Sequence, residues 1–155
     1  NQTYILPDFR RNQKELDKIR VTLDSITSNP DYEITGIYLT GYASPEGSYA
    51  QNEVLSRDRT RALRNYLLRR YSFPENLYHV DWRGEDWIGL KRLILLYGMP
   101  NEEQVLSIME NYSVFEGREK RLMDLNNGKP YRYMMKHFFP ELRRVDYKIT
   151  YKVIK

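Results

Sequence analysis

The chain has 155 residues, of which 41% are hydrophobic and 30% charged, the balance of an ordinary globular domain. Its 25 lysines and arginines are interleaved with 21 acidic residues, so the net charge of +4 does not form a dedicated stripe for nucleic acid. The lack of cysteine excludes disulfides, thiolate catalysis and cysteine-based zinc sites. This length predicts a single domain over residues 1–155.

The N-terminal part predicts a short strand followed by an amphipathic helix. Thr3–Leu6 has strand character, and Asn12 followed by Glu15 has the spacing of a capping box. Apolar residues then recur at helical intervals: Leu16, Ile19, Leu23 and Ile26. Because the chain starts at Asn1 and shows no signal peptide and no apolar run of ~20 residues, we expect a processed or excised part of a larger protein.

The stretch from Ile34 to Tyr71 predicts a strand, a tight loop and a long helix. The strand is indicated by a β-branched and aromatic run that ends near Thr40. The loop is indicated by the turn-forming residues Gly41, Pro45, Gly47 and Ser48. From about Tyr49 the period becomes helical, and the expected buried stripe consists of Leu55, Ala62, Leu63, Tyr66 and Leu67.

Arg59 falls on this expected stripe, where burial would remove the hydration of its guanidinium and demand an anionic partner. Asn52 and Ser56 precede it at helical spacing, so the three could form a polar row near the loop. The functional interpretation is a clamp for a carboxylate ligand at the mouth of the loop. The alternative is a structural arginine paired with Glu46, Glu53 or the sheet's carboxyl edge.

The rest of the chain predicts two further strands separated by helices. Leu77–Trp82 and Val145–Val153 alternate in polarity, as strands with one buried face do. Their similar alternation predicts that they pair with each other in antiparallel fashion. Residues 85–142 are expected to form a helical insertion packed beside the sheet. Its packing residues are expected to be Trp87, Leu90, Ile94 and Phe138.

Asp81, Glu85 and Asp86 cluster in sequence around Trp82 and Trp87. Carboxylates beside aromatic rings resemble a glycan-handling surface, and paired acids can act in acid–base catalysis. The simpler interpretation, which we favour, is that Asp86 caps the helix that follows. We therefore do not expect an enzyme.

His79 and His137 are far apart in sequence and lack the spacing of metal ligands. We expect no metal site, and no motif indicates a cofactor.

The loop and helix resemble the OmpA-like peptidoglycan-binding domain. That family joins a Gly-His-Thr-Asp loop to a helix carrying Asn, Leu-Ser-x-x-Arg-Ala and Val-x-x-x-Leu. The matching positions here are Gly41, Gly47, Asn52, Leu55, Ser56, Arg59, Leu63 and Leu67. The family's Asn-Arg-Arg-Val before its last strand corresponds to Leu142-Arg143-Arg144-Val145. The family's His-Thr-Asp is Tyr42-Ala43-Ser44 here, so the loop aspartate is absent.

The resemblance implies an α/β two-layer sandwich with a β-α-β-α-β-β mixed sheet and a helical insertion before the last strand. It also implies binding of the diaminopimelate-type peptide stem of peptidoglycan, in the periplasm of a Gram-negative bacterium and attached to the outer membrane. In the family, the arginine and the loop aspartate hold the two ends of a zwitterion. The implied ligand-binding residues are Tyr42, Ala43, Ser44, Glu46, Gly47, Asn52 and Arg59.

Two functions of different classes remain open for such a domain. One is an anchor that holds an outer-membrane or surface-structure protein to the cell wall, with Glu46 as the candidate substitute for the missing aspartate. The other is a protein-interaction or assembly module that has lost peptidoglycan binding and docks through its helical insertion. Neither requires nucleic acid, and contact with a membrane would come through an upstream segment.

Overall fold

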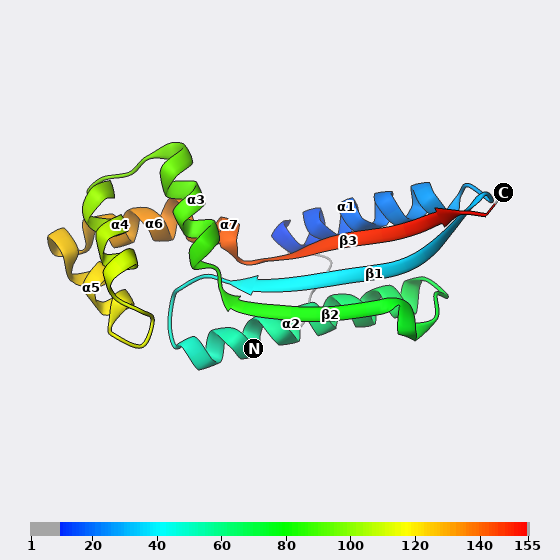
Figure 1. The fold of residues 1–155 in the computed structure, drawn as a ribbon, viewed down its shortest axis with the longest axis horizontal. Coiled ribbons are helices and arrows are strands. Elements are labelled where there is room, and N and C mark those ends of the chain that lie inside the picture. The colour runs from blue at the N-terminus through cyan, green and yellow to red at the C-terminus, as the bar shows by residue number, and fades with distance from the viewer. Residues whose placement is uncertain (1–9, 155) are drawn as a thin grey trace.

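The computed structural model describes residues 10–154 and shows a mixed sheet with helices on one face and a helical group at one end (Figure 1). The elements in the sheet part are α1 (Arg10–Thr27), β1 (Tyr32–Ala43), α2 (Tyr49–Arg70), β2 (Tyr78–Glu85) and β3 (Arg144–Val153). Those in the insertion are α3 (Trp87–Tyr97), α4 (Glu102–Asn111), α5 (Arg118–Asp124), α6 (Lys129–His137) and α7 (Phe139–Leu142). Short 3₁₀ turns occupy Glu75–Leu77 and Leu125–Gly128.

The two N-terminal predictions have different outcomes. The strand predicted at Thr3–Leu6 lies outside the described residues. The first helix is present, but it begins at Arg10, two residues before the predicted cap at Asn12. Its apolar spacing places Leu16, Ile19 and Leu23 in the core, as expected.

The sheet has the order β2-β1-β3 among the described strands. β1 runs parallel to β2, with Ile37 opposite Tyr78, and antiparallel to β3, with Ile37 opposite Ile149. The predicted mixed sheet containing residues 34–42 and 145–153 is therefore confirmed. The predicted pairing of the third strand with the last is wrong, because β1 lies between them. The alternation of polar and apolar residues showed that one face of each strand is buried. It did not show which strand lies beside it.

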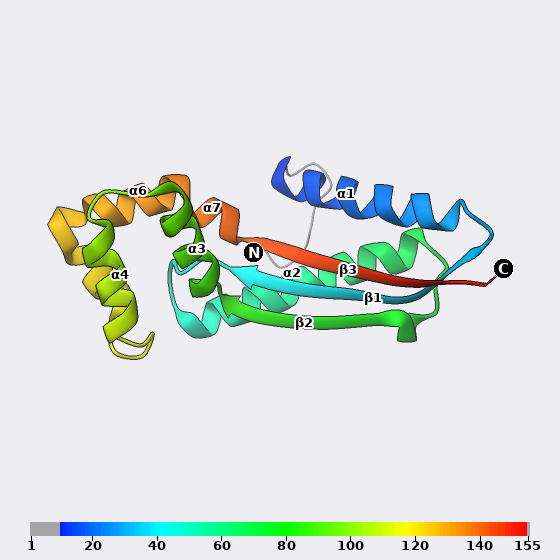
Figure 2. The same ribbon diagram turned by 45° about the horizontal axis from the view of Figure 1, so that its top comes forward.

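Helices α1 and α2 cover the same face of the sheet, and no described helix covers the other (Figures 1 and 2). The core between the two layers is apolar and consists of Leu16, Ile19, Leu23, Ile34, Ile37, Leu39, Leu63, Leu67, Tyr78 and Val145. This arrangement confirms the predicted two-layer α/β sandwich.

Helix α2 packs closely against β1 at Gly41. A Cβ atom added there would lie 1.8 Å from Thr60 Oγ1 and 2.5 Å from the Ser56 carbonyl oxygen. The interior row of the first half of α2 is therefore small and polar, namely Asn52, Ser56 and Thr60, and only from Leu63 onward is it apolar. The stripe predicted to begin at Leu55 was correct only for its second half, because the sequence pattern did not show how tightly the backbones meet.

The insertion lies beyond the carboxyl ends of β1 and β2, and not beside the sheet as expected (Figures 1 and 2). It has a hydrophobic cluster of its own: Leu90, Ile94, Val105, Leu122, Tyr131, Met134, Phe138, Phe139 and Leu142. Trp87 packs against this cluster, so the four packing residues predicted for the insertion are confirmed.

Candidate functional site

The loop between β1 and α2 is shaped by two local features. Gly47 adopts a positive φ of 87°, the left-handed conformation that glycine accepts without strain. Ser48 then caps α2, because its hydroxyl accepts a hydrogen bond from the backbone N–H of Gln51 at 3.0 Å. The loop thus ends at a helix N-terminus whose partial positive charge favours anionic groups nearby.

A pair of opposite charges stands at this loop. Arg143, from the link between α7 and β3, places its Nη1 2.7 Å from Glu46 Oε1. Buried Ser44 donates its hydroxyl to the same carboxylate oxygen at 3.2 Å, and Arg143 Nη1 lies 3.4 Å from the hydroxyl. The side chains of Arg143 and Glu46 are 38% and 33% exposed, so the pair is accessible to water.

Asn52 fastens the loop to the end of β2. Its side-chain amide donates to the Glu46 carbonyl oxygen at 2.9 Å and to Glu85 Oε2 at 2.8 Å. The other Glu85 oxygen accepts from Trp87 Nε1 at 2.9 Å. Burial raises the pKa of Glu85, although the two hydrogen bonds oppose this shift by stabilising the charged form.

Glu119 connects the same loop to the insertion. Its Oε2 accepts from the backbone N–H of Gly47 at 3.2 Å and from the Tyr131 hydroxyl at 2.6 Å. Burial raises the pKa of Tyr131, and the hydrogen bond to Glu119 raises it further. The loop is therefore held from both sides, by the sheet part and by α5 and α6.

Arg144 contacts other partners than its neighbour Arg143 does. Its Nη1 lies 2.7 Å from Asp86 Oδ2, and its guanidinium carbon lies 4.2 Å from the centroid of the Tyr42 ring. Asp86 uses its other oxygen to cap α3, by accepting from Gly89 N at 2.9 Å. This confirms the predicted capping role of Asp86.

The carboxylates of Asp81, Glu85 and Asp86, which lie in β2 and directly after it, do not face one common point. Asp81 pairs with Arg83 on β2, and the hydrogen bond from Arg83 lowers the pKa of Asp81. Glu85 and Asp86 have the separate partners described above. The interpretation of this group as paired acids therefore has no geometric support, and Asp86 acts as a structural cap.

The structure brings together four of the residues predicted to bind ligand: Ser44, Glu46, Gly47 and Asn52. Ala43 points into the core, and Tyr42 lies beside Arg144 on the uncovered side of the sheet. Arg59 lies about 10 Å further along α2 than Asn52, given the helical rise of ~1.5 Å per residue. It is half-buried, next to the interior row.

Four residues of the site were not among the ligand-binding residues predicted from the sequence. Arg143 had a usable signal, because it belongs to the second segment that resembles the OmpA-like family. Glu85 was singled out with Asp81 and Asp86, but not as a partner of Asn52 at the loop. Glu119 and Tyr131 had no signal, because they come from helices whose placement against the loop is a property of the tertiary structure.

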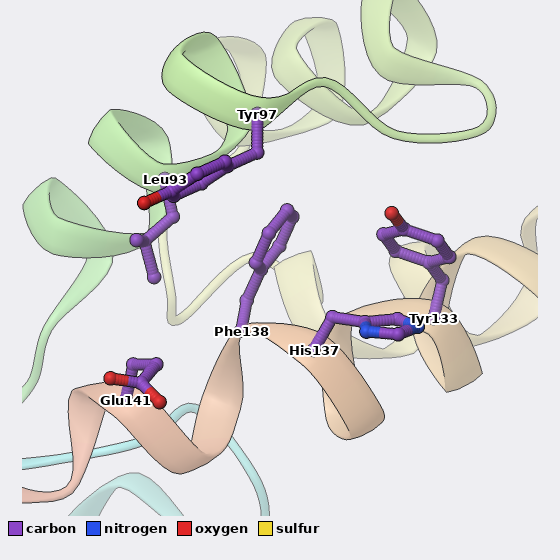
Figure 3. A pocket seen from close by; sticks show the side chains of 6 residues that line it. All are labelled: Leu93, Tyr97, Tyr133, His137, Phe138 and Glu141. Carbon is purple, nitrogen blue, oxygen red and sulfur yellow. The ribbon is translucent and has the colours of Figure 1, made fainter.

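A separate pocket of about 460 Å³ lies in the insertion, between α3 and the α6–α7 segment (Figure 3). Its lining residues are Leu93, Tyr97, Tyr133, His137, Phe138 and Glu141. His137 packs against Tyr133, with ring centroids 4.4 Å apart. The aromatic walls suit an apolar or ring-stacking group.

Within residues 10–154, no group of three or more histidine, aspartate or glutamate side chains is arranged to hold a metal ion. None of the helices in this same range combines the length and apolar character that crossing a bilayer requires.

No protein-family model matches the chain. Over 49 residues the chain is 39% identical to Outer membrane protein 41 of Porphyromonas gingivalis. The matched segment covers 32% of this chain and 12% of that protein, so the chain corresponds to a small part of the relative.

Proposed function

We propose that the chain is a non-catalytic binding module of the periplasm that holds the peptide stems of peptidoglycan at the loop formed by residues 44–47. The observation that supports this most directly is the half-exposed pair of Glu46 and Arg143 beside the start of α2. A stem peptide of the diaminopimelate type carries an ammonium and a carboxylate on one side chain. The pair offers one partner for each of them.

Exchange of the internal pair for a ligand is energetically feasible. An ion pair with this exposure contributes only about 0–1 kcal/mol, so opening it costs little. Glu46 would then accept from the ligand's ammonium, and Arg143 would bind its carboxylate through two parallel hydrogen bonds. In this proposal Glu46 replaces the family's loop aspartate, and Arg143 shares or takes over the role expected of Arg59.

The second candidate is an assembly module that attaches a surface structure by protein contacts. It is favoured by the internal hydrogen bonding of the loop, where Ser44, Glu46 and Asn52 all have protein partners. In that case the same network serves to fix the insertion on the sheet.

Retention on purified peptidoglycan separates the two candidates. We expect the wild-type protein to bind, and Arg143→Gln and Glu46→Gln each to weaken binding by about 1.5–3 kcal/mol, the scale of a hydrogen bond to a charged group. Arg83→Gln breaks an exposed arginine–aspartate pair elsewhere on the surface and is the matched control. Arg59→Ala measures how much Arg59 contributes to peptidoglycan binding. Ser44→Asp should strengthen that binding.

Failure of the wild-type protein to bind would contradict the peptidoglycan proposal. If binding then appeared in Ser44→Asp, the site would be one that lost the ability with its aspartate. If neither protein bound, the assembly module would be the better interpretation.

A further inference from the structure

Helix α3 is apolar on two opposite sides, and only one of them is covered. Leu90 and Ile94 are fully buried in the core of the insertion. Ile88, Leu95 and Leu96 are 76%, 60% and 67% exposed. Large aliphatic side chains that lie together on an exposed surface mark an interaction site, so the uncovered side of α3 indicates a binding surface.

We call the uncovered side of α3 the α3 ridge. It consists of Ile88, Lys91, Arg92, Leu95 and Leu96. Ile88 and Leu95 are seven residues apart and lie in line along the helix, with Leu96 beside them. Lys91 and Arg92 lie between these two turns, on either side of the Ile88–Leu95 line. The ridge therefore combines an apolar crest with two cations.

The charge of α3 restricts the occupant of the ridge. The helix sequence from Trp87 to Tyr97 contains no acidic residue, so the two cations on the ridge have no anionic partner within their own helix. A second copy packed across a two-fold axis at the ridge would bring both cations of each copy together, which is repulsive. The occupant must be both apolar and anionic.

We propose that the α3 ridge binds the surface of a bilayer that contains anionic phospholipid. The helix of 11 residues would lie in the plane of the surface, about 16 Å long at the usual helical rise. Ile88, Leu95 and Leu96 would enter the boundary between headgroups and acyl chains, while Lys91 and Arg92 meet the lipid phosphates. A bilayer yields to protruding side chains, so this ridge requires no preformed groove in its partner.

This surface is independent of the loop proposed to bind peptidoglycan, because the ridge residues are not part of the network around Glu46. A domain with both would be held near a membrane at one end and would contact the cell wall at the loop. Three aliphatic side chains and two cations give weak, reversible attachment, which a second anchor would strengthen.

Vesicle flotation tests the proposal with the full 155-residue chain. Vesicles of phosphatidylcholine with about 30% phosphatidylglycerol, which gives the surface a negative potential, are compared with pure phosphatidylcholine. We expect binding only to the anionic vesicles, with loss at high salt. Lys91→Gln combined with Arg92→Gln should weaken it roughly thirtyfold, since each cation near such a surface contributes about 1 kcal/mol. Ile88→Ser combined with Leu95→Ser should weaken it at least roughly tenfold.

The matched control lies on α1, where Lys18→Gln combined with Val21→Ser removes one exposed cation and one aliphatic residue that is 68% exposed. It should bind as the wild type does. Absence of binding to anionic vesicles, or equal binding by the ridge variants and the control, would overturn the proposal. Self-association that is lost in Ile88→Ser/Leu95→Ser, without vesicle binding, would assign the ridge to a second copy of the chain instead.

Discussion

The sheet part and the helical insertion of this domain are held together in different ways. In the sheet part, strands distant in sequence pair directly, and α1 and α2 close one core over them. In the insertion, short helices that follow one another along the chain enclose a second core. The two cores share no residue, and the contacts between the parts described above are largely polar. The comparison indicates that each part has its own source of stability.

The candidate site lies at the joint, the region where the sheet part and the insertion contact each other. Glu46 and Asn52 belong to the sheet part, whereas Trp87, Glu119 and Tyr131 belong to the insertion. A site built across such a joint depends on how firmly the two parts are fixed relative to one another. Three experiments compare the stability of the sheet part, the insertion and the joint, from the largest expected effect to the smallest.

Truncating a core residue in each part should have the largest effect. Phe139→Ala in the insertion and Leu39→Ala in β1 both remove fully buried side chains, and they should cost about 3–5 and about 2–5 kcal/mol, respectively. Urea unfolding would be followed through Trp87 in a Trp82→Phe background and through Trp82 in a Trp87→Phe background. We expect Phe139→Ala to lower the unfolding free energy reported by Trp87 and to change the unfolding free energy reported by Trp82 by less than ~1 kcal/mol. Coincident shifts at both reporters would show that the two parts unfold as one unit.

Removing the side chain at the joint should have an intermediate effect. Asp86→Ala removes the cap of α3 and the partner of Arg144, which together should cost about 2 kcal/mol of unfolding free energy. Asp86→Asn keeps a side-chain oxygen for the cap and should cost about half of that. Asp146→Ala removes an exposed partner of the same arginine and should cost less than ~0.5 kcal/mol. Equal losses in Asp86→Ala and Asp146→Ala would show that the joint is not held by Asp86.

A buried tyrosine in the sheet part should give a small effect that depends on pH. The hydroxyl of Tyr78 is buried and has no hydrogen-bond partner among the described residues. Burial raises the pKa of Tyr78 to about 12 from its ordinary value of 10.0. Because the folded pKa is the higher one, the stabilisation is complete below pH 10 and is lost as the pH rises from 10 towards 12.

Tyr78→Phe should therefore change the unfolding free energy by less than ~1 kcal/mol at neutral pH. Between pH 9 and 11 the wild type should lose about 1 kcal/mol more than the variant, measured by urea unfolding at each pH. The exposed Tyr151→Phe is the control. Parallel pH dependences for the wild type and Tyr78→Phe would mean that Tyr78 ionises as readily in the folded chain as in the unfolded one.

Local features of this protein were largely determined by its sequence. Asp86 caps the start of α3 as expected, and Gly98 directly follows its last residue, Tyr97. The alternation from Val145 onward placed Val145, Tyr147 and Ile149 toward the core, although Tyr151 and Val153 on the same face are exposed at the end of β3. These features depend on residues within a few positions of each other, so periodicity and turn chemistry are sufficient to predict them.

The partners of those elements were decided only by the tertiary structure. Periodicity identifies which side of a strand is buried, but it does not identify the neighbour, and so β1 was not expected between β2 and β3. The same holds for the site. Arg143 reaches Glu46 across 97 positions of sequence, because the insertion returns the chain to the end of the sheet where the loop begins. The resemblance marked the segment that contains Arg143, but no local pattern identified Glu46 as its partner, since that partner is set by packing and not by spacing.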